Sequence, residues 1–236
     1  MHKEILYKST GDKVNDHVLI MKAYVITIMD HERSVQSAKR CIKSAEKNGL
    51  EVEMWKATTP KDLPFDILIS KNVGVTPFDE VYSRTQNCAA AFCSHMSLWE
   101  KSIEINEPVV IFEHDAVVHD KVPTDISFDK VMTFSKPSYG NFNTPPSLGV
   151  NPLIQKAYFG GAHGYIVKPE GAKELIKQAQ IEAKPADVFL NLEYFPWLQE
   201  YYPWVCTAMD DFTTIQNPVG CQAKHRYGET YGIEKI

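Results

Sequence analysis

The sequence has no long hydrophobic run. A membrane-spanning helix needs about 20 consecutive apolar residues, and the best candidate, residues 18–29, is short and contains Lys22. The first residues also lack the basic-then-apolar order of a secretory signal peptide. These absences predict a chain with no transmembrane segment and, together with its cysteine content, a cytoplasmic location.

Cysteine is scarce and shows no paired spacing. The five cysteines are odd in number, and none belongs to a Cys-x-x-Cys motif. Disulfide frameworks and four-cysteine zinc sites both need regular pairs, so the sequence favours reduced thiols and argues against such a zinc site. The five residues are Cys41, Cys88, Cys93, Cys206 and Cys221.

Positive charge is not in excess either. The chain has 25 Lys and Arg residues against 30 Asp and Glu residues, which gives a net charge of −5. A general nucleic-acid binder carries a broad basic field, so the composition argues against that class. The composition is still compatible with a local basic patch. Hydrophobic residues at 44% and charged residues at 23% are typical of a globular chain and exclude a fibrous or largely disordered one.

What the sequence does contain is an alternation of strand and helix signals. Residues 23–29 form a short β-branched apolar run, and residues 30–48 carry apolar side chains at helical spacing up to Gly49. Residues 50–56 then alternate as a strand does. Such a strand–helix–strand unit is typical of a parallel α/β sheet. Further along, the pattern predicts helices over 87–105 and 169–182 and strands over 108–112, 130–134 and 162–168.

One α/β domain accounts for most of the chain. At about 150 residues per domain, the length corresponds to one large domain or two small ones, and no internal repeat divides it. We expect residues 1–21 to be an N-terminal extension, residues 22–216 to be the α/β domain, and residues 217–236 to be a tail that packs on or near the site. Residues 135–157, rich in Pro, Gly and Asn, lack periodicity; a segment of this kind is often a functional loop.

A pair of acidic residues follows the strand predicted over 108–112. Ligand sites of open α/β sheets lie beyond the carboxyl ends of strands, and Glu113 and Asp115 occupy such an end. If the chain stays extended, residues i and i+2 point the same way, so both carboxylates face one site while His114 points away. Two hard oxygen ligands suit Mg²⁺ or Mn²⁺, which neutralises a diphosphate leaving group. A solvated strand-to-loop turn is the alternative interpretation of the acidic pair, and for His114 we favour a packed or solvent-facing role.

Several segments together resemble one known family. Residues 87–101 (NCAAAFCSHMSLWEK) precede residues 108–115 (PVVIFEHD), and residues 160–173 (GGAHGYIVKPEGAK) precede Pro185-Ala-Asp187. In this order and spacing, and with the opening strand that ends near Arg33, they are similar to the motifs of glycosyltransferase family 25. This is the lipooligosaccharide and procollagen galactosyltransferase type, and the resemblance spans about residues 22–215.

The resemblance implies a GT-A-like fold, a nucleotide-sugar-binding α/β domain with a mostly parallel central sheet flanked by helices. It implies a metal-dependent transferase that uses Mn²⁺, or Mg²⁺, and moves a hexose, galactose or glucose, from a UDP-sugar. The acceptor is a hydroxyl of a glycan, a lipid-linked saccharide or a protein, as in lipopolysaccharide biosynthesis. No nucleic-acid partner is implied.

The resemblance also suggests roles for individual residues. Asp115 is the candidate for direct metal coordination, and Glu113 contributes to the metal or the catalytic chemistry through water or the donor ribose. Asp187 is a candidate for acceptor binding or base chemistry. Thr27 and Arg33 sit where the first strand meets its loop, so they are candidates for contact with the nucleotide or diphosphate; Arg binds phosphate with a bidentate fork.

Three histidines leave alternatives open. His163 lies among glycines that allow close backbone approach to a ligand, so it has either a pocket role or a core role. His225 is either a third metal ligand near the C-terminus or part of a solvated basic turn. His114 stands where the family has Asp, which removes one negative charge and favours softer metal ions.

The Asp-to-His departure at residue 114 supports a second hypothesis for the function, a catalytically degenerate protein that binds sugar nucleotide or glycan. A third, a nucleotidyltransferase, normally needs a Gly-rich phosphate loop, and residues 27–33 contain no glycine.

Overall fold

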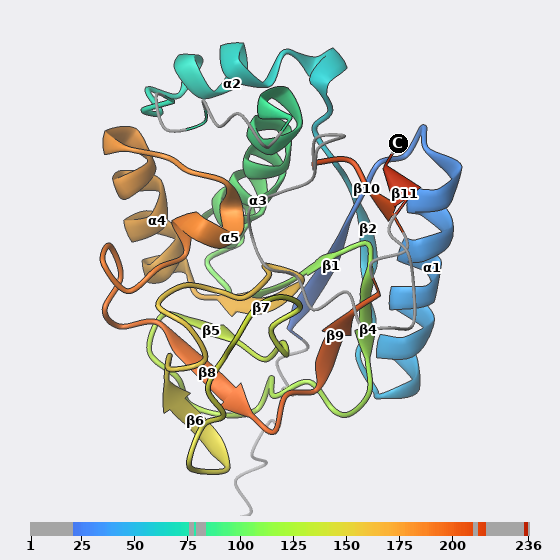
Figure 1. Cartoon of the computed structure of the whole chain (residues 1–236), viewed down its shortest axis with the longest axis vertical. Helices are drawn as coiled ribbons and strands as arrows, with labels where there is room; N and C mark the ends of the chain where they lie inside the picture. Colours follow the sequence, from blue (N-terminus) through green and yellow to red (C-terminus); the bar gives the residue numbers. More distant parts are fainter. Residues whose placement is uncertain (1–20, 76–77, 79–83, 210–211, 216–233, 236) are drawn as a thin grey trace, which may run out of the picture.

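A computed structural model describes residues 21–75, 78, 84–209, 212–215 and 234–235. Within these residues, seven strands form one central sheet in the order β2-β1-β3-β7-β5-β8-β6. Helices cover both of its faces (Figure 1): α1 lies on one face, and α2, α3 and α4 lie on the other. The predicted α/β fold class is therefore confirmed.

The bounds of the elements follow the chain. The helices are α1 (Glu32–Lys47), the 3₁₀ helix η1 (Pro60–Asp62), α2 (Pro64–Ser70), α3 (Thr85–Ile105), α4 (Pro169–Ile181) and α5 (Ala186–Phe189). The strands are β1 (Lys22–Thr27), β2 (Glu53–Lys56), β3 (Val109–Glu113), β4 (Ala116–Val118), β5 (Val131–Thr133), β6 (Gly149–Pro152), β7 (Gly164–Val167), β8 (Gln199–Tyr202), β9 (Cys206–Ala208), β10 (Phe212–Thr213) and β11 (Glu234–Lys235).

The central sheet is mixed rather than mostly parallel. β1 pairs in parallel with β2 and β3, and β5 pairs in parallel with β8. β7 lies between these two parts and runs antiparallel to both β3 and β5, with Phe112 opposite Gly164. The physical reason is the connection: parallel neighbours need a crossover, whereas the chain enters β7 from a loop at the edge where β3 ends. At the outer edge, β6 is antiparallel to β8.

The sheet separates two hydrophobic clusters. In β3, Val109 and Ile111 pack into the cluster that contains α3 and α4, whereas Val110 and Phe112 pack into the cluster that contains α1. Successive side chains of a strand point to opposite faces. A strand buried on both sides therefore reads as a continuous apolar run, which is why the sequence revealed it.

Three described elements lie inside segments where we expected loops. η1 and α2 fall within the loop-rich residues 57–86, and β6 falls within residues 135–157. The ends of the chain are mostly outside the described residues, so the proposed extension (residues 1–21) and tail (residues 217–236) stay predictions.

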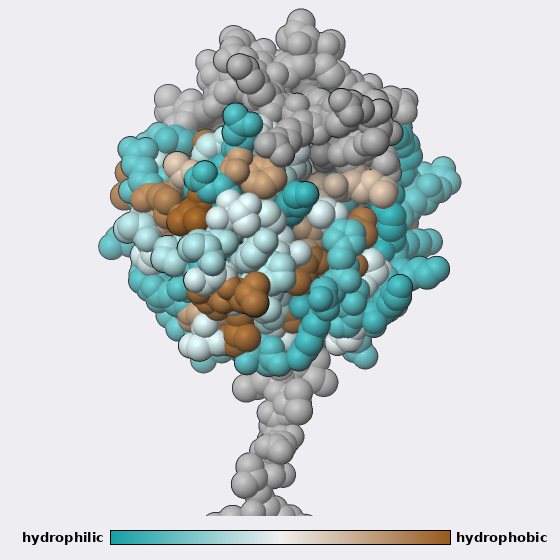
Figure 2. Space-filling view, turned by 60° about the horizontal axis from the view of Figure 1, so that its bottom comes forward, coloured by the Kyte–Doolittle hydropathy of each residue, from teal (hydrophilic) through white to brown (hydrophobic). Residues whose placement is uncertain are grey.

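None of the described helices is both long and apolar enough to cross a bilayer. On the face shown in Figure 2, hydrophobic side chains form separate patches among hydrophilic ones. No disulfide joins the four described cysteines, in line with the predicted reduced thiols, and all four are buried: Cys41, Cys88, Cys93 and Cys206.

Candidate active site

Glu113 lies at the carboxyl end of β3, and α3 holds its carboxylate. Its Oε1 is 3.1 Å from Nε2 of His95, which is only 1% exposed, whereas the Glu113 side chain is 33% exposed. Burial raises the pKa of Glu113, but the hydrogen bond and the charge of nearby histidines outweigh it and hold the pKa below its ordinary value. Glu113 is therefore a carboxylate at neutral pH, fixed on one side and open on the other.

A chain of buried hydrogen bonds fixes His95 in turn. The hydroxyl of Tyr165 lies 2.9 Å from His95 Nδ1 and accepts a hydrogen bond of 2.9 Å from Trp99 Nε1. An indole N–H only donates and a carboxylate only accepts. With a neutral His95 ring the proton directions then follow: Trp99 donates to Tyr165, Tyr165 to His95 Nδ1, and His95 Nε2 to Glu113. His95 and Trp99 are four residues apart on α3, so they lie on the same helix face.

Replacing Tyr165 with Phe removes the centre of this chain. The indole N–H of Trp99 and Nδ1 of His95 would both lose their partner inside the protein. An unsatisfied buried polar group costs about 1–3 kcal/mol, so we expect the free energy of unfolding to fall by roughly 2 kcal/mol or more, measured by urea denaturation. Tyr201→Phe, at a partly exposed position, is the matched control. Equal stability of the two variants would contradict the hydrogen-bond chain.

Asp187 comes to the same region from α5. Its Oδ2 accepts a 2.7 Å hydrogen bond from the hydroxyl of Tyr139, and its Oδ1 accepts one of 2.9 Å from the backbone N–H of Val188. Burial raises the pKa of Asp187, and the negative charge of Glu113 raises it further, although the Tyr139 hydrogen bond opposes both. The two carboxylates therefore lie near enough to influence each other.

His163 precedes β7 and also responds to Glu113. Its ring is buried, and burial lowers its pKa to about 4 against the opposing influence of Glu113 and a hydrogen bond with the Lys136 backbone. Among the described residues its Nε2 has no hydrogen-bond partner. A Cβ on Gly161, whose φ is 129°, would lie 2.5 Å from His163 Nδ1, so glycine is required beside this ring. The structure thus gathers Glu113, His163 and Asp187.

Asp115 is oriented differently from Glu113. Residues 114–115 form a turn between β3 and β4, so the extended chain that would aim both carboxylates the same way is not present. The charge of Asp115 raises the pKa values of Cys41 and Cys206, which belong to the cluster on the α1 side. The charge of Asp115 therefore acts on groups on the α1 side of the sheet, whereas Glu113 is hydrogen-bonded to His95 on the α3 side.

The two residues suggested for nucleotide contact have different surroundings. Thr27 is fully buried and its hydroxyl donates to the carbonyl of Val25. Arg33, in the first turn of α1, places its guanidinium 4.7 Å from the ring centroid of Phe212. Phe212 also stacks on His114 at 5.1 Å, so His114 is packed, which is one of the two roles we favoured for it. Nothing in the sequence pattern indicated this cluster around Phe212.

The described residues do not by themselves make a metal centre. Across the described ranges, no three His, Cys, Asp or Glu side chains lie close enough together to hold an ion. His225, suggested as a third ligand, lies outside those ranges.

Fold and site together define an α/β protein with carboxylates gathered near the end of a central strand. Comparison with known sequences gives its family: residues 20–190 match glycosyltransferase family 25, described as an LPS biosynthesis protein. The chain belongs to glycosyltransferase family 25, which confirms the resemblance seen in its motifs.

Curated relatives share this assignment at low identity. The chain is similar to a "Glycosyltransferase 25 family member" of Anopheles gambiae, 23% identical over 231 residues that cover 85% of this chain and 35% of that protein. It is also similar to a protein of the same name from Aedes aegypti, 25% identical over 210 residues that cover 80% of this chain and 33% of that protein. The chain spans about a third of the length of these relatives.

Proposed function

We propose that this chain transfers a hexose from a UDP-sugar to a hydroxyl of a glycan, a lipid-linked saccharide or a protein. Family membership supports glycosyl transfer in general. The observation that carries the proposal is the position of Asp187, whose carboxylate is held by Tyr139 and whose pKa is raised by burial and by the charge of Glu113 from another element of the fold. Galactose and glucose are the sugars that the resemblance favours.

Asp187 suits the role of general base toward the acceptor hydroxyl. A base must hold a lone pair within hydrogen-bond reach of the proton that it takes, and a raised pKa makes its carboxylate more basic. Tyr139 keeps Oδ2 of Asp187 in one position. Glu113, ionised and held by His95, keeps a negative charge near Asp187 and presents one exposed side for a donor or acceptor hydroxyl.

A divalent cation is a separate part of the proposal. Mn²⁺, or Mg²⁺, bound by Asp115 with help from Glu113 would neutralise the diphosphate leaving group. The described side chains supply too few ligands for a complete site, so this part requires a further ligand from elsewhere, for which His225 is the candidate.

The donor is tested by thermal shift with UDP-, GDP-, CMP- and dTDP-sugars, each with and without Mn²⁺. A ligand at about 100 times its Kd adds roughly 2.7 kcal/mol, which raises the Tm by several degrees in a chain of this size. We expect a shift with one UDP-sugar that needs Mn²⁺ and is lost in Asp115→Ala but kept in the surface control Asp120→Ala. No shift with any donor would contradict the proposal, and a shift independent of Mn²⁺ would remove the metal.

The second candidate is a sugar-nucleotide or glycan-binding protein without turnover. It is favoured by His114, which replaces a family carboxylate and packs against Phe212 with its pKa lowered by burial to about 4. Release of UDP from a bound UDP-sugar separates the two functions. Binding without any release, even with acceptor present, would support the second candidate.

A further inference from the structure

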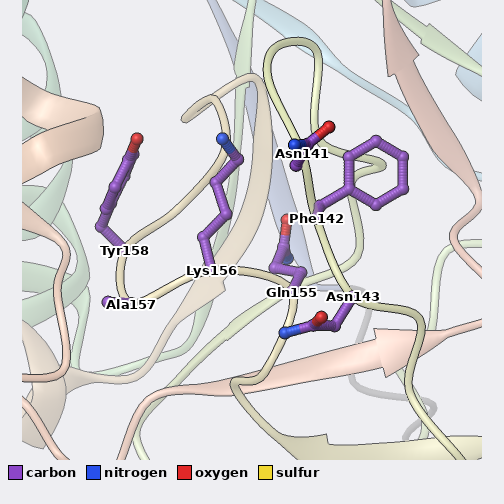
Figure 3. Close-up of a pocket in the computed structure, with 7 residues that line it drawn as sticks. All are labelled: Asn141, Phe142, Asn143, Gln155, Lys156, Ala157 and Tyr158. Atoms are coloured by element: carbon purple, nitrogen blue, oxygen red, sulfur yellow. The ribbon is translucent and has the colours of Figure 1, made fainter. Parts of the chain in front are cut away.

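A pocket of about 360 Å³ lies between two stretches of the chain, residues 141–143 and residues 155–158. Residues 141–143 form one wall and residues 155–158 form the other (Figure 3). Small-molecule sites in proteins have volumes of about 300–1,000 Å³, so this pocket is large enough for a small ligand. No role given above uses it.

Gln155 is the polar centre of the pocket. It is 1% exposed, and its backbone N–H donates to Oε1 of Glu200 at 2.8 Å. Its side chain lies beside the same carboxylate, while neither its Oε1 nor its Nε2 has a partner at hydrogen-bond geometry among the described residues. A buried acceptor without a donor costs free energy. It therefore indicates a ligand that brings an O–H or N–H group.

The pocket is rigidly built around Gln155. Glu200 is fully buried, and its carboxylate accepts hydrogen bonds from the backbone of Ile154 at 2.6 Å and of Gln155, and from the indole of Trp204 at 3.1 Å. Trp204 in turn meets the ring of Phe142 edge-on at 5.5 Å. One buried carboxylate thus fixes both walls, and binding needs little ordering of the loop.

Aromatic, amide and ammonium groups meet at this pocket. Figure 3 shows Tyr158 at one end, Phe142 at the other, and the side chains of Lys156 and Gln155 extending between them, with Asn141 on the opposite segment. Aromatic rings pack against C–H groups. Amides both donate and accept hydrogen bonds, as hydroxyls do. A sugar ring has both features, apolar C–H faces and a rim of hydroxyls.

The pocket is connected to the proposed base. The ring of Tyr158 stacks on that of Tyr139 at 6.4 Å, and the hydroxyl of Tyr139 donates to Asp187. Lys156 Nζ lies 4.6 Å from the Tyr139 ring centroid, which ties the same wall together. A single aromatic contact and a single hydrogen bond therefore lead from the pocket wall to the carboxylate that takes the acceptor proton.

We propose that this pocket binds one sugar ring of the acceptor, and that Gln155 Oε1 accepts a hydrogen bond from one of its hydroxyls. This inference rests on the transferase function proposed above, because it assigns the acceptor side to this pocket. It makes the acceptor a saccharide, whether free, lipid-linked or carried on a protein.

Binding is tested directly by NMR. ¹⁵N-labelled protein is titrated with methyl β-D-galactopyranoside, methyl β-D-glucopyranoside and methyl β-D-glucuronide, and the side-chain NH₂ signals of Asn141 and Gln155 are followed. We expect saturable shifts of these signals with at least one probe. Gln155→Leu should weaken that binding by roughly tenfold, read from the Asn141 signal, whereas Gln180→Leu, an exposed position on α4, should not. Absence of shifts with all three probes, or equal affinity of the two variants, would overturn the proposal.

Donor hydrolysis separates this inference from the proposed function. Gln155→Leu should keep the donor-induced thermal shift and the slow release of UDP without acceptor, while the acceptor KM for the bound methyl glycoside rises roughly tenfold. Loss of the donor-induced shift in this variant would assign the pocket to the donor and overturn the inference. Sugar-dependent NMR shifts in a wild-type protein that releases no UDP would contradict the transferase function alone. If Gln155→Leu does not fold, Asn141→Ala serves in the same experiments, read from the Gln155 signal.

Discussion

Asp187→Asn is expected to lower kcat for sugar transfer by about 10²–10⁴-fold, the usual contribution of a general base. The amide has the same shape as the carboxylate: its oxygen still accepts the hydrogen bond of the Val188 N–H and its NH₂ group donates to the hydroxyl oxygen of Tyr139, so Tm and donor affinity should change little. What the variant loses is the group that takes the proton. Initial rates at saturating donor, together with the donor-induced thermal shift, measure the two properties separately.

The pH profile gives an independent check of the same role. Because burial and Glu113 raise the pKa of Asp187, transfer by the wild-type protein should fall as pH falls through that raised pKa and the base becomes protonated. The Tyr139 hydrogen bond lowers this pKa, so Tyr139→Phe should move the acidic limb of the profile to higher pH. Asp120→Asn, an exposed control, should leave the profile unchanged. Wild-type kcat in Asp187→Asn, or an equal loss of donor affinity, would contradict the role of base.

Phe189→Ala should cause the largest loss of stability, about 3–5 kcal/mol. The fully buried ring of Phe189 lies 5.1 Å from that of Phe92, 5.8 Å from that of Trp99 and 5.4 Å from that of Phe195. Removing it leaves a cavity between α3 and α5. At about 2–4 °C per kcal/mol, the Tm should fall by at least 6 °C, measured by calorimetry together with urea denaturation.

The neighbouring Val188 provides the matched control for this prediction. Val188 is 38% exposed, so Val188→Ala should change the free energy of unfolding by no more than about 0.5 kcal/mol. Because α5 carries Asp187, Phe189→Ala should also reduce transfer below the Tm, whereas Val188→Ala should not. A loss of less than about 1 kcal/mol in Phe189→Ala would show that the aromatic cluster does not anchor α5.

The strongly periodic parts of the sequence predicted the fold, and the short irregular parts did not. The apolar run in residues 108–112 and the helical spacing in residues 30–48 each describe an element buried against the core, so their positions were readable. β6 pairs with one neighbour at the sheet edge and contains Gly149 and Pro152, which weaken any strand signal. The antiparallel direction of β7 depends on where its loop enters the sheet, and periodicity carries no information about that.

The site was readable only in part for similar reasons. Family motifs indicated Glu113 and Asp187, but the different setting of Asp115 comes from a turn that the pattern does not show. The i, i+4 spacing of His95 and Trp99 was a usable signal for the hydrogen-bond chain. Gln155 belongs to a segment without periodicity, where length alone suggested a function. Its position depends on hydrogen bonds to Glu200, which comes from another strand, and the sequence pattern does not show that contact.

The sheet divides the hydrophobic core into two clusters, and this division matters for engineering the protein. Distant sites without shared partners contribute to stability almost independently, and the cluster around α1 lies across the sheet from His95, Tyr165 and Asp187. Stabilising substitutions often reduce activity when they stiffen a functional site. On the α1 side, positions away from Arg33 and Asp115 are therefore those in which thermal tolerance can be increased while His95, Glu113 and Asp187 keep their geometry.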